Sequence, residues 1–207
     1  MKLTSILAVA VIAFSSAASA GGAPIWTGVY LGAHAGGGFG ELGDGTTTFD
    51  TDGFVGGVHG GYNFTTSGVV FGVEGDFSWS NVEGSKSFDF GGVTAKATVG
   101  SDWLASIRGR VGVPVTPSLL LYGTAGVAWA DVNGRVTVST GDISSISSTQ
   151  TGYVVGGGGE LAFDRNWSGR VEALYYAFDD AKFSTAGATP FDASVTVVRA
   201  GLTYHLN

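Results

Sequence analysis

The chain is 207 residues long, has a formal net charge of −7, and contains 36 glycines, 4 prolines and no cysteine. This length is that of one domain, the acidic balance argues against nucleic acid as a partner, and the fold cannot rely on disulfides. Hydrophobic residues make up 44% of the chain and recur at regular spacing, which excludes a disordered polypeptide.

The first twenty residues have the pattern of a secretory signal peptide. Lys2 is followed by an apolar run from Ile6 to Phe14 and then by Ala18-Ser19-Ala20, which forms an A-x-A cleavage site. The apolar run is too short to span a bilayer, and no cysteine follows that could carry a lipid. We therefore expect a signal peptide over residues 1–20 and a mature domain over residues 21–207. The alternative is a short N-terminal anchor helix.

Eight segments of the mature chain alternate apolar residues with polar or small ones at the period of two that is typical of a β-strand. The third segment is the clearest, because Phe71, Val73 and Phe77 share one face while Glu74 and Asp76 share the other. In chain order the predicted strands cover residues 26–39, 53–64, 69–80, 103–113, 119–130, 151–163, 167–178 and the stretch after Asp192.

The connections between these strands fall into two length classes. Three short turns are predicted at residues 65–68, 114–118 and 164–166, and four longer polar loops at residues 40–52, 81–92, 131–150 and 179–192. The ends of the third loop are suited to pair as a hairpin extension. No apolar stretch after Phe14 is long enough for a spanning helix, and closed barrels also satisfy every backbone group in lipid. We therefore predict an all-β fold: an eight-stranded antiparallel up-and-down transmembrane β-barrel of the cell outer membrane, with short periplasmic turns and four longer external loops.

The five tryptophans test this topology independently. Trp26 and Trp167 fall at the predicted periplasmic rim, whereas Trp79, Trp103 and Trp129 fall at the predicted external rim on the outward face. Tryptophan is enriched at both membrane interfaces, so the five residues are predicted to form two aromatic girdles. The alternative is the core of a soluble β-sandwich, which would not require tryptophans to lie at strand ends.

The predicted inward face contains four acids and four arginines. A charge on the lipid face would cost about 2 to 4 kcal/mol at the bilayer midplane, so these side chains are expected inside. An eight-stranded barrel is only wide enough for its own side chains, which favours an interior charge network over an open channel. A gated narrow pore for ions is the alternative. The predicted network consists of Glu74, Asp76, Arg108, Arg110, Glu160, Arg170, Glu172 and Arg199.

Two of the three histidines are predicted to face each other inside the barrel. If the first two strands pair around their loop, His34 and His59 lie nearly opposite one another. Two facing imidazoles are able to contact a metal or a haem iron. The alternative is a hydrogen-bonded interior pair, which is favoured because no third ligand is evident. We therefore expect no bound cofactor.

The chain shows no arrangement of residues typical of an enzyme. A lipid-modifying barrel would need a serine, a histidine and a carboxylate at the membrane-facing rim, and no histidine is predicted to face outward. The predicted loops contain six carboxylates, which are either ordinary solvated groups, bridges through divalent cations to lipopolysaccharide phosphates, or part of a host-surface recognition site. They are Glu41, Asp44, Asp50, Asp52, Asp179 and Asp180.

Several short segments carry a resemblance to a known family. They are residues 26–32, 57–64, 103–112 with Arg108-Gly109-Arg110, 169–176 with Arg170 and Glu172, and 199–204. In this order they resemble the small outer-membrane β-barrels of Gram-negative bacteria, the OmpA-like and opacity-type porin-like proteins, and most closely an alphaproteobacterial branch that includes haemin-binding surface proteins.

The resemblance implies an envelope-integrity or surface protein with no catalytic residues. The implied partners are outer-membrane lipid, lipopolysaccharide and the barrel-assembly machinery, with a host-surface or haemin ligand as further candidates. A narrow porin-like channel or a haemin-binding protein is the alternative function. One departure concerns the end of the chain, because such barrels usually finish on an aromatic residue and this chain finishes on Leu206 and Asn207. We expect assembly, with lower efficiency.

Overall fold

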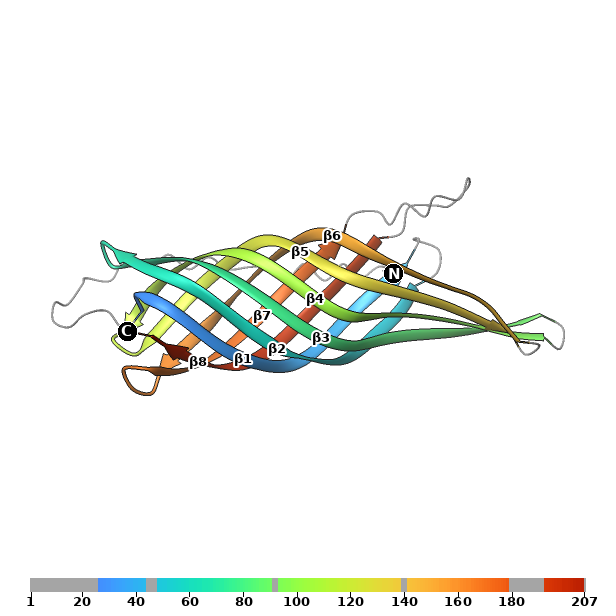
Figure 1. The fold of residues 1–207 in the computed structure, drawn as a ribbon, viewed down its shortest axis with the longest axis horizontal. Helices are drawn as coiled ribbons and strands as arrows, with labels where there is room; N and C mark the ends of the chain where they lie inside the picture. The colour runs from blue at the N-terminus through green and yellow to red at the C-terminus, as the bar shows by residue number, and fades with distance from the viewer. Residues whose placement is uncertain (1–25, 44–47, 91–92, 139–140, 179–191, 207) are drawn as a thin grey trace, which may run out of the picture.

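The computed structural model describes residues 26–43, 48–90, 93–138, 141–178 and 192–206, and these form a closed barrel of eight antiparallel strands. Each strand pairs with its neighbour in the sequence, and β1 pairs with β8 to close the barrel (Figure 1). The predicted fold class is confirmed. The strands are β1 (Gly28–Gly43), β2 (Thr48–Thr66), β3 (Val69–Phe90), β4 (Val93–Thr116), β5 (Leu119–Val138), β6 (Gly141–Ala162), β7 (Trp167–Phe178) and β8 (Asp192–His205).

The three short turns lie together at one end of the barrel, beside the C-terminal end of β8 (Figure 1). Only Ser67 and Gly68 separate β2 from β3, and both have positive φ, 51° and 78°. Positive φ at both central residues is the pattern of a type I′ hairpin, whose twist matches that of the two strands. The short turns predicted from the sequence are therefore present.

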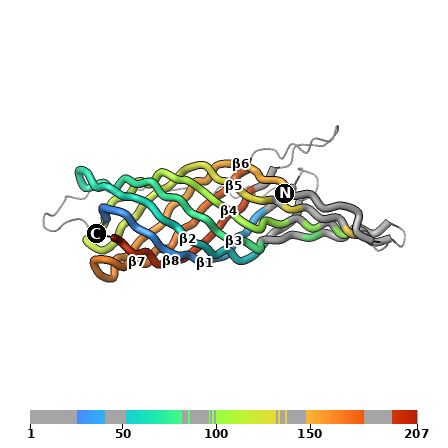
Figure 2. The backbone as a smooth tube through the Cα atoms, in the orientation of Figure 1, coloured from blue at the N-terminus to red at the C-terminus, as the bar shows by residue number. Residues whose placement is uncertain are grey.

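The alternation of outward and inward residues follows the prediction in all eight strands. In β7, for example, Val171 is 59% exposed and Tyr175 is 37% exposed, whereas Arg170 and Glu172 are buried. Because successive side chains of a strand point to opposite sides, one face of each strand presents apolar groups outward and the other fills the barrel. The tube view shows how the strands tilt around the barrel axis (Figure 2).

The predicted loops were partly wrong, because the strands continue through most of their residues. β3 and β4 pair as far as Phe90 and Val93, so residues 81–90 are strand. The 40–52 and 131–150 segments are likewise mostly paired. Outside lipid a strand needs no apolar face, so the alternation used for prediction disappears there. The strand itself continues, because ladder hydrogen bonds still satisfy its backbone. The extended β3–β4 and β5–β6 hairpins project furthest from the end opposite the short turns (Figure 1).

Two β-bulges mark where this extension leaves the barrel. The register shifts between Trp79 and Val82 in β3 and between Ser101 and Leu104 in β4. A bulge bends and twists a strand locally, which separates the barrel wall from the projecting hairpins. The predicted signal peptide, Asn207 and residues 179–191 of the fourth predicted loop lie outside the described residues. The described part of the chain contains no helix that is long and apolar enough to cross a membrane.

Candidate functional site

The barrel interior contains a layer of eight charged side chains. They come from five strands, because inward positions of β3, β4, β6, β7 and β8 reach the same level of the lumen. All eight are buried, and none exceeds 7% exposure. The structure therefore brings together every residue of the predicted network, with four acids balancing four arginines: Glu74, Asp76, Arg108, Arg110, Glu160, Arg170, Glu172 and Arg199.

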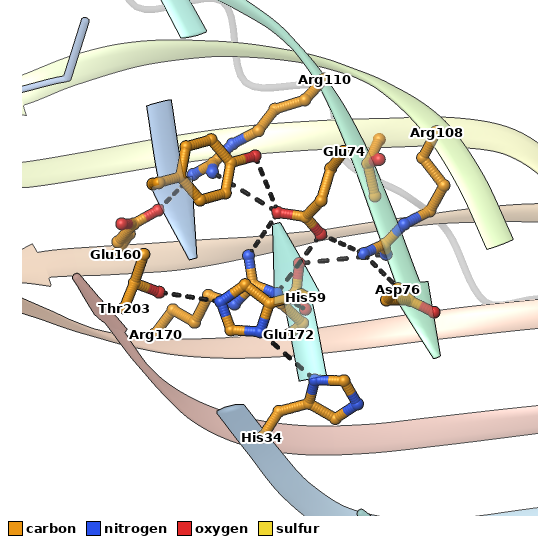
Figure 3. A network of polar contacts seen from close by, with 12 residues as sticks. His34, His59, Glu74, Asp76, Arg108, Arg110, Glu160, Arg170, Glu172 and Thr203 are labelled. Carbon is orange, nitrogen blue, oxygen red and sulfur yellow. Dashed lines mark hydrogen bonds and ion pairs between the residues drawn. The ribbon is translucent and has the colours of Figure 1, made fainter. Parts of the chain in front are cut away.

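Glu74 is the centre of this network (Figure 3). Its carboxylate is ion-paired with Arg108 on the neighbouring strand β4 and with Arg170 on β7, whose Nη1 lies 2.5 Å from Oε2. The hydroxyl of Tyr30 donates a hydrogen bond to the same oxygen at 2.9 Å. Arg110 and Arg199 lie slightly farther from Glu74, at 3.9 and 4.0 Å. One carboxylate thus faces all four arginines.

Arg199 on the last strand joins the two remaining acids on that side of the lumen. Its Nη2 lies 2.9 Å from Oδ1 of Asp76, and its Nε donates to Oε2 of Glu172 at 2.8 Å. Asp76 also pairs with Arg108 at 2.9 Å. Charge-assisted hydrogen bonds are stronger than those between neutral groups, and these groups are removed from water. In this part of the lumen the acids and arginines therefore neutralise one another's charge.

A second group of polar residues lies around Glu160. The carboxylate is ion-paired with Arg110 and accepts a hydrogen bond from the Ser168 hydroxyl at 2.6 Å, while His205 Nε2 lies 3.2 Å away. The guanidinium of Arg110 lies 3.8 Å from the centroid of the Tyr122 ring. This cation–π contact and the ion pair hold Arg110 from two sides.

The Ser168, His205 and Glu160 grouping was not predicted, because all three face inward and the search concerned the outer rim. Its geometry is not that of a hydrolase. Nε2 of His205 contacts both the serine and the carboxylate, whereas a catalytic triad needs the two ring nitrogens to face different partners. Ser168 donates to the carboxylate and is fully buried, so it has no access to a substrate.

The two predicted interior histidines lie in direct contact. Their Nδ1 atoms are 3.3 Å apart, and their rings are stacked with centroids 5.5 Å apart. Nε2 of His34 faces the Ser78 hydroxyl at 2.8 Å, and Nε2 of His59 faces the Thr203 hydroxyl at 3.0 Å. All four ring nitrogens thus have protein partners, so a metal or haem iron would have to displace one of them. The described residues contain no cluster of three metal-ligating side chains.

Two apolar clusters enclose the charged layer. At the end with the short turns, Trp26, Val70 and Leu120 pack with Tyr122. Toward the projecting hairpins a larger cluster fills the lumen, and its members are Val55, Leu104, Ala128, Ala130, Val154, Leu174, Tyr176, Phe178 and Val197. The sequence contained a signal for both, because large apolar residues occupy inward positions near the strand ends. The interior is therefore layered as apolar, ionic and apolar.

Trp26 corrects one prediction, since it does not belong to a lipid-facing girdle. It is 2% exposed and lies inside the barrel, edge-on to the ring of His205. Trp26 precedes β1, where strand alternation no longer guarantees a face, but it is two residues from Gly28 and four from the inward Tyr30. Counting back in steps of two from Tyr30 through Gly28 reaches Trp26, so the alternation of β1 would have placed its indole inside the barrel.

The other four tryptophans lie at outward positions. Trp79 is 61% exposed and Trp167 is 46% exposed. Trp103 is paired with Trp79 across β3 and β4, and Trp129 is paired with the outward Ala105. Of the six predicted loop carboxylates, Asp52 is exposed; the side chains of the other five, Glu41, Asp44, Asp50, Asp179 and Asp180, lie outside the described residues.

Comparison with known proteins decides the family. Residues 6–205 match the model of the outer membrane protein beta-barrel domain. The chain belongs to this family. The 31 kDa outer-membrane immunogenic protein of Brucella melitensis is 32% identical over 200 residues, covering 86% of this chain and 83% of the relative. The 22 kDa outer membrane protein of Rhizobium leguminosarum is 36% identical over 166 residues, covering 77% and 71%. This family barrel is therefore a protein of the outer membrane.

Solved structures agree on the fold of this family barrel. OprG from Pseudomonas aeruginosa has a TM-score of 0.51 at 12% identity, with 86% of this chain and 95% of that chain covered. Neisserial surface protein A has a TM-score of 0.50 at 14% identity, with 87% and 98% covered. At these identities the likeness shows a shared barrel fold alone.

Proposed function

We propose that this outer-membrane barrel has a structural role in the envelope or a role in interactions at the cell surface, with a lumen closed to solutes. The observation that carries the proposal is the layered interior. A buried ionic layer lies between two buried apolar clusters, and each of the four acids faces at least one arginine. A conducting pathway would need to cross all three layers.

The physical cost of such a pathway supports a closed lumen. A hydrated ion entering the central layer would have to separate charges such as Glu74 and Arg170, and breaking a buried pair on one side costs about 3 to 5 kcal/mol. It would also have to displace packed side chains such as Leu120 and Leu174, which are 0% and 1% exposed. An enzymatic role has no support, because the one serine, histidine and carboxylate grouping that we identify is buried.

The surface role is supported by the hairpins that project beyond the barrel, where exposed groups such as Ser85 and Lys96 lie. The Brucella relative is named an immunogenic protein, which fits a protein exposed at the cell surface. We infer that outer-membrane lipid and lipopolysaccharide contact the outward face, and that the barrel-assembly machinery inserts the chain. A host-surface or haemin ligand would bind at the projecting end.

Planar-bilayer recording of the purified protein tests the closed lumen, with a general porin in the same membrane as a positive control. We expect no stable single-channel steps from the wild type. The matched variant Glu74→Gln changes the charge inside the lumen and nothing on the outer surface. Wild-type conductance steps whose size or ion selectivity changes in Glu74→Gln would show that ions cross the lumen and would refute the proposal.

Complementation distinguishes the two roles at the envelope. Cells lacking the protein are compared for sensitivity to detergent and chelator, and then supplied with the wild type or with a chain whose β3–β4 hairpin tip, residues 86–97, is exchanged. A structural role predicts rescue by both chains. A surface-interaction role predicts that adhesion or ligand binding returns only with the native tip.

A further inference from the structure

A chain of hydrogen bonds crosses the seam at which the barrel closes. It begins at Arg199 on β8, whose Nη1 lies 3.2 Å from Nε2 of His34 on β1. It continues from Nδ1 of His34 to Nδ1 of His59 on β2, and from Nε2 of His59 back to the Thr203 hydroxyl on β8. The His59–Thr203 end of this chain is seen in Figure 3. The two imidazoles therefore link the first two strands to the last.

The contacts fix the tautomer of both rings. An arginine guanidinium has only donors, so Nε2 of His34 must accept from Arg199, and the Ser78 hydroxyl at 2.8 Å is able to donate to the same nitrogen. The single proton of His34 then lies on Nδ1. That proton points to Nδ1 of His59, which must then accept, leaving the proton of His59 on Nε2 for the Thr203 oxygen. The chain of bonds works only when both imidazoles are neutral.

Protonation of either ring places two donors against each other. A second proton on His34 would lie on Nε2, against the Arg199 guanidinium at 3.2 Å, with the Ser78 hydroxyl at 2.8 Å as its one recorded acceptor. A second proton on His59 would face the Nδ1 proton of His34. Both events put positive charges or donors together in a buried site, which is costly.

Within the part of the chain that the structure describes, the carboxylates around the two rings are already paired with arginines. The charged groups around the two rings are Glu74 and Asp76 of β3, Arg170 and Glu172 of β7, and Arg199 of β8, and the Tyr30 ring of β1 lies 6.5 Å from that of His59. Each of the three carboxylates already faces at least two arginines. Arg108, which pairs with Glu74 and Asp76, is the third arginine facing these three carboxylates, so the surroundings of the pair are balanced before any proton is added.

We propose that the His34–His59 pair is an acid-sensitive latch of the β1–β8 seam, closed while both imidazoles are neutral and released when one is protonated. The third histidine is a natural contrast, because Nε2 of His205 lies 3.2 Å from a Glu160 carboxylate oxygen, and neither an arginine nor a second imidazole is its recorded partner. The device is independent of the proposed surface or structural role.

The first measurement is the tautomer state in the intact barrel at pH 7.5, by nitrogen-15 NMR of labelled histidines. We expect the proton of His34 on Nδ1 and that of His59 on Nε2. The second is hydrogen exchange of the wild type at pH 7.5 and pH 5.0, expressed as protection relative to the unstructured chain. Protection should fall at least about tenfold across the β1–β8 ladder, where Ala35 pairs with Ala200, and not in the β4–β5 ladder, where Gly109 pairs with Ala125.

Variants then assign the effect to the latch. The unfolded chain protonates its histidines below about pH 6.5, whereas the closed latch keeps both neutral. Each of the two histidines therefore raises the unfolding constant by up to about tenfold for every pH unit of acidification. The double variant His34→Gln with His59→Asn should lose this acid effect, while the control His205→Asn should keep it. Equal acid sensitivity in the wild type and the double variant would overturn the proposal. So would a proton of His34 on Nε2, or a uniform loss of protection around the wild-type barrel, and these two outcomes need no variant to fold.

Discussion

Replacing Glu74 with glutamine tests whether the interior network stabilises the barrel by charge balance. The glutamine has nearly the same shape, but it leaves Asp76, Glu160 and Glu172 facing four arginines, so one buried positive charge is uncompensated. The ion pairs with Arg108 and Arg170 lose their negative partner, and because glutamine keeps only one acceptor oxygen, its amide nitrogen points a donor at an arginine donor. Removing one partner of a buried pair costs about 3 to 5 kcal/mol.

Urea unfolding of the purified barrel in micelles measures this cost. With a slope of about 2 kcal/mol per molar urea, the midpoint should fall by about 2 M. The charge balance is restored in the double variant Glu74→Gln with Arg170→Met, so its destabilisation should be smaller than the sum of the two single variants by about 0.5 to 3 kcal/mol. A loss under about 1 kcal/mol for Glu74→Gln, or strict additivity in the double variant, would refute the reasoning.

Three further predictions concern the turn-bearing end of the barrel. Trp26→Ala should destabilise the fold by about 3 to 5 kcal/mol, because the indole is buried in the apolar cluster. Brominated acyl chains should quench the fluorescence of the exposed Trp79 but not that of Trp26. Quenching of both tryptophans would place Trp26 in lipid. Gly68→Ala should cost about 1 kcal/mol in urea unfolding because φ is +78°, whereas Ser67→Asn at φ 51° should be close to neutral. Asp164 accepts backbone hydrogen bonds from the N–H groups of Asn166 and Trp167, both at 2.8 Å, which hold the pKa of its carboxyl below the usual value. The contribution of Asp164 to stability should be present above its unfolded-state pKa and lost as the pH falls through its folded-state pKa. Asp164→Asn should remove this pH dependence. An NMR titration that gives Asp164 the pKa of a free aspartate would contradict the prediction.

The strand faces could be predicted because lipid imposes a strict period of two. Arg108 and Arg110, or Glu172 and Arg170, are placed inward by nothing more than their parity with neighbouring apolar residues. The hydrogen-bonded partners could not be predicted, since parity gives no level along the barrel axis, and the contact of Glu74 with Arg170 depends on the register of five strands. Strand ends were missed for the opposite reason, because beyond the membrane near Ser85 and Thr98 the constraint that produced the pattern no longer acts.

The order in which the chain supplies its interior charges has a consequence for assembly. Strands β3 to β7 contribute all four acids but only three of the arginines, and the fourth, Arg199, arrives with β8. A barrel that lacks β8 thus has one unmatched negative charge in its interior, beside Asp76 and Glu172, which are the ion-pair partners of Arg199. The last strand completes the hydrogen-bonded wall and neutralises the interior in the same step. A chain truncated before β8 therefore loses both the closing ladder hydrogen bonds and the charge balance of the interior.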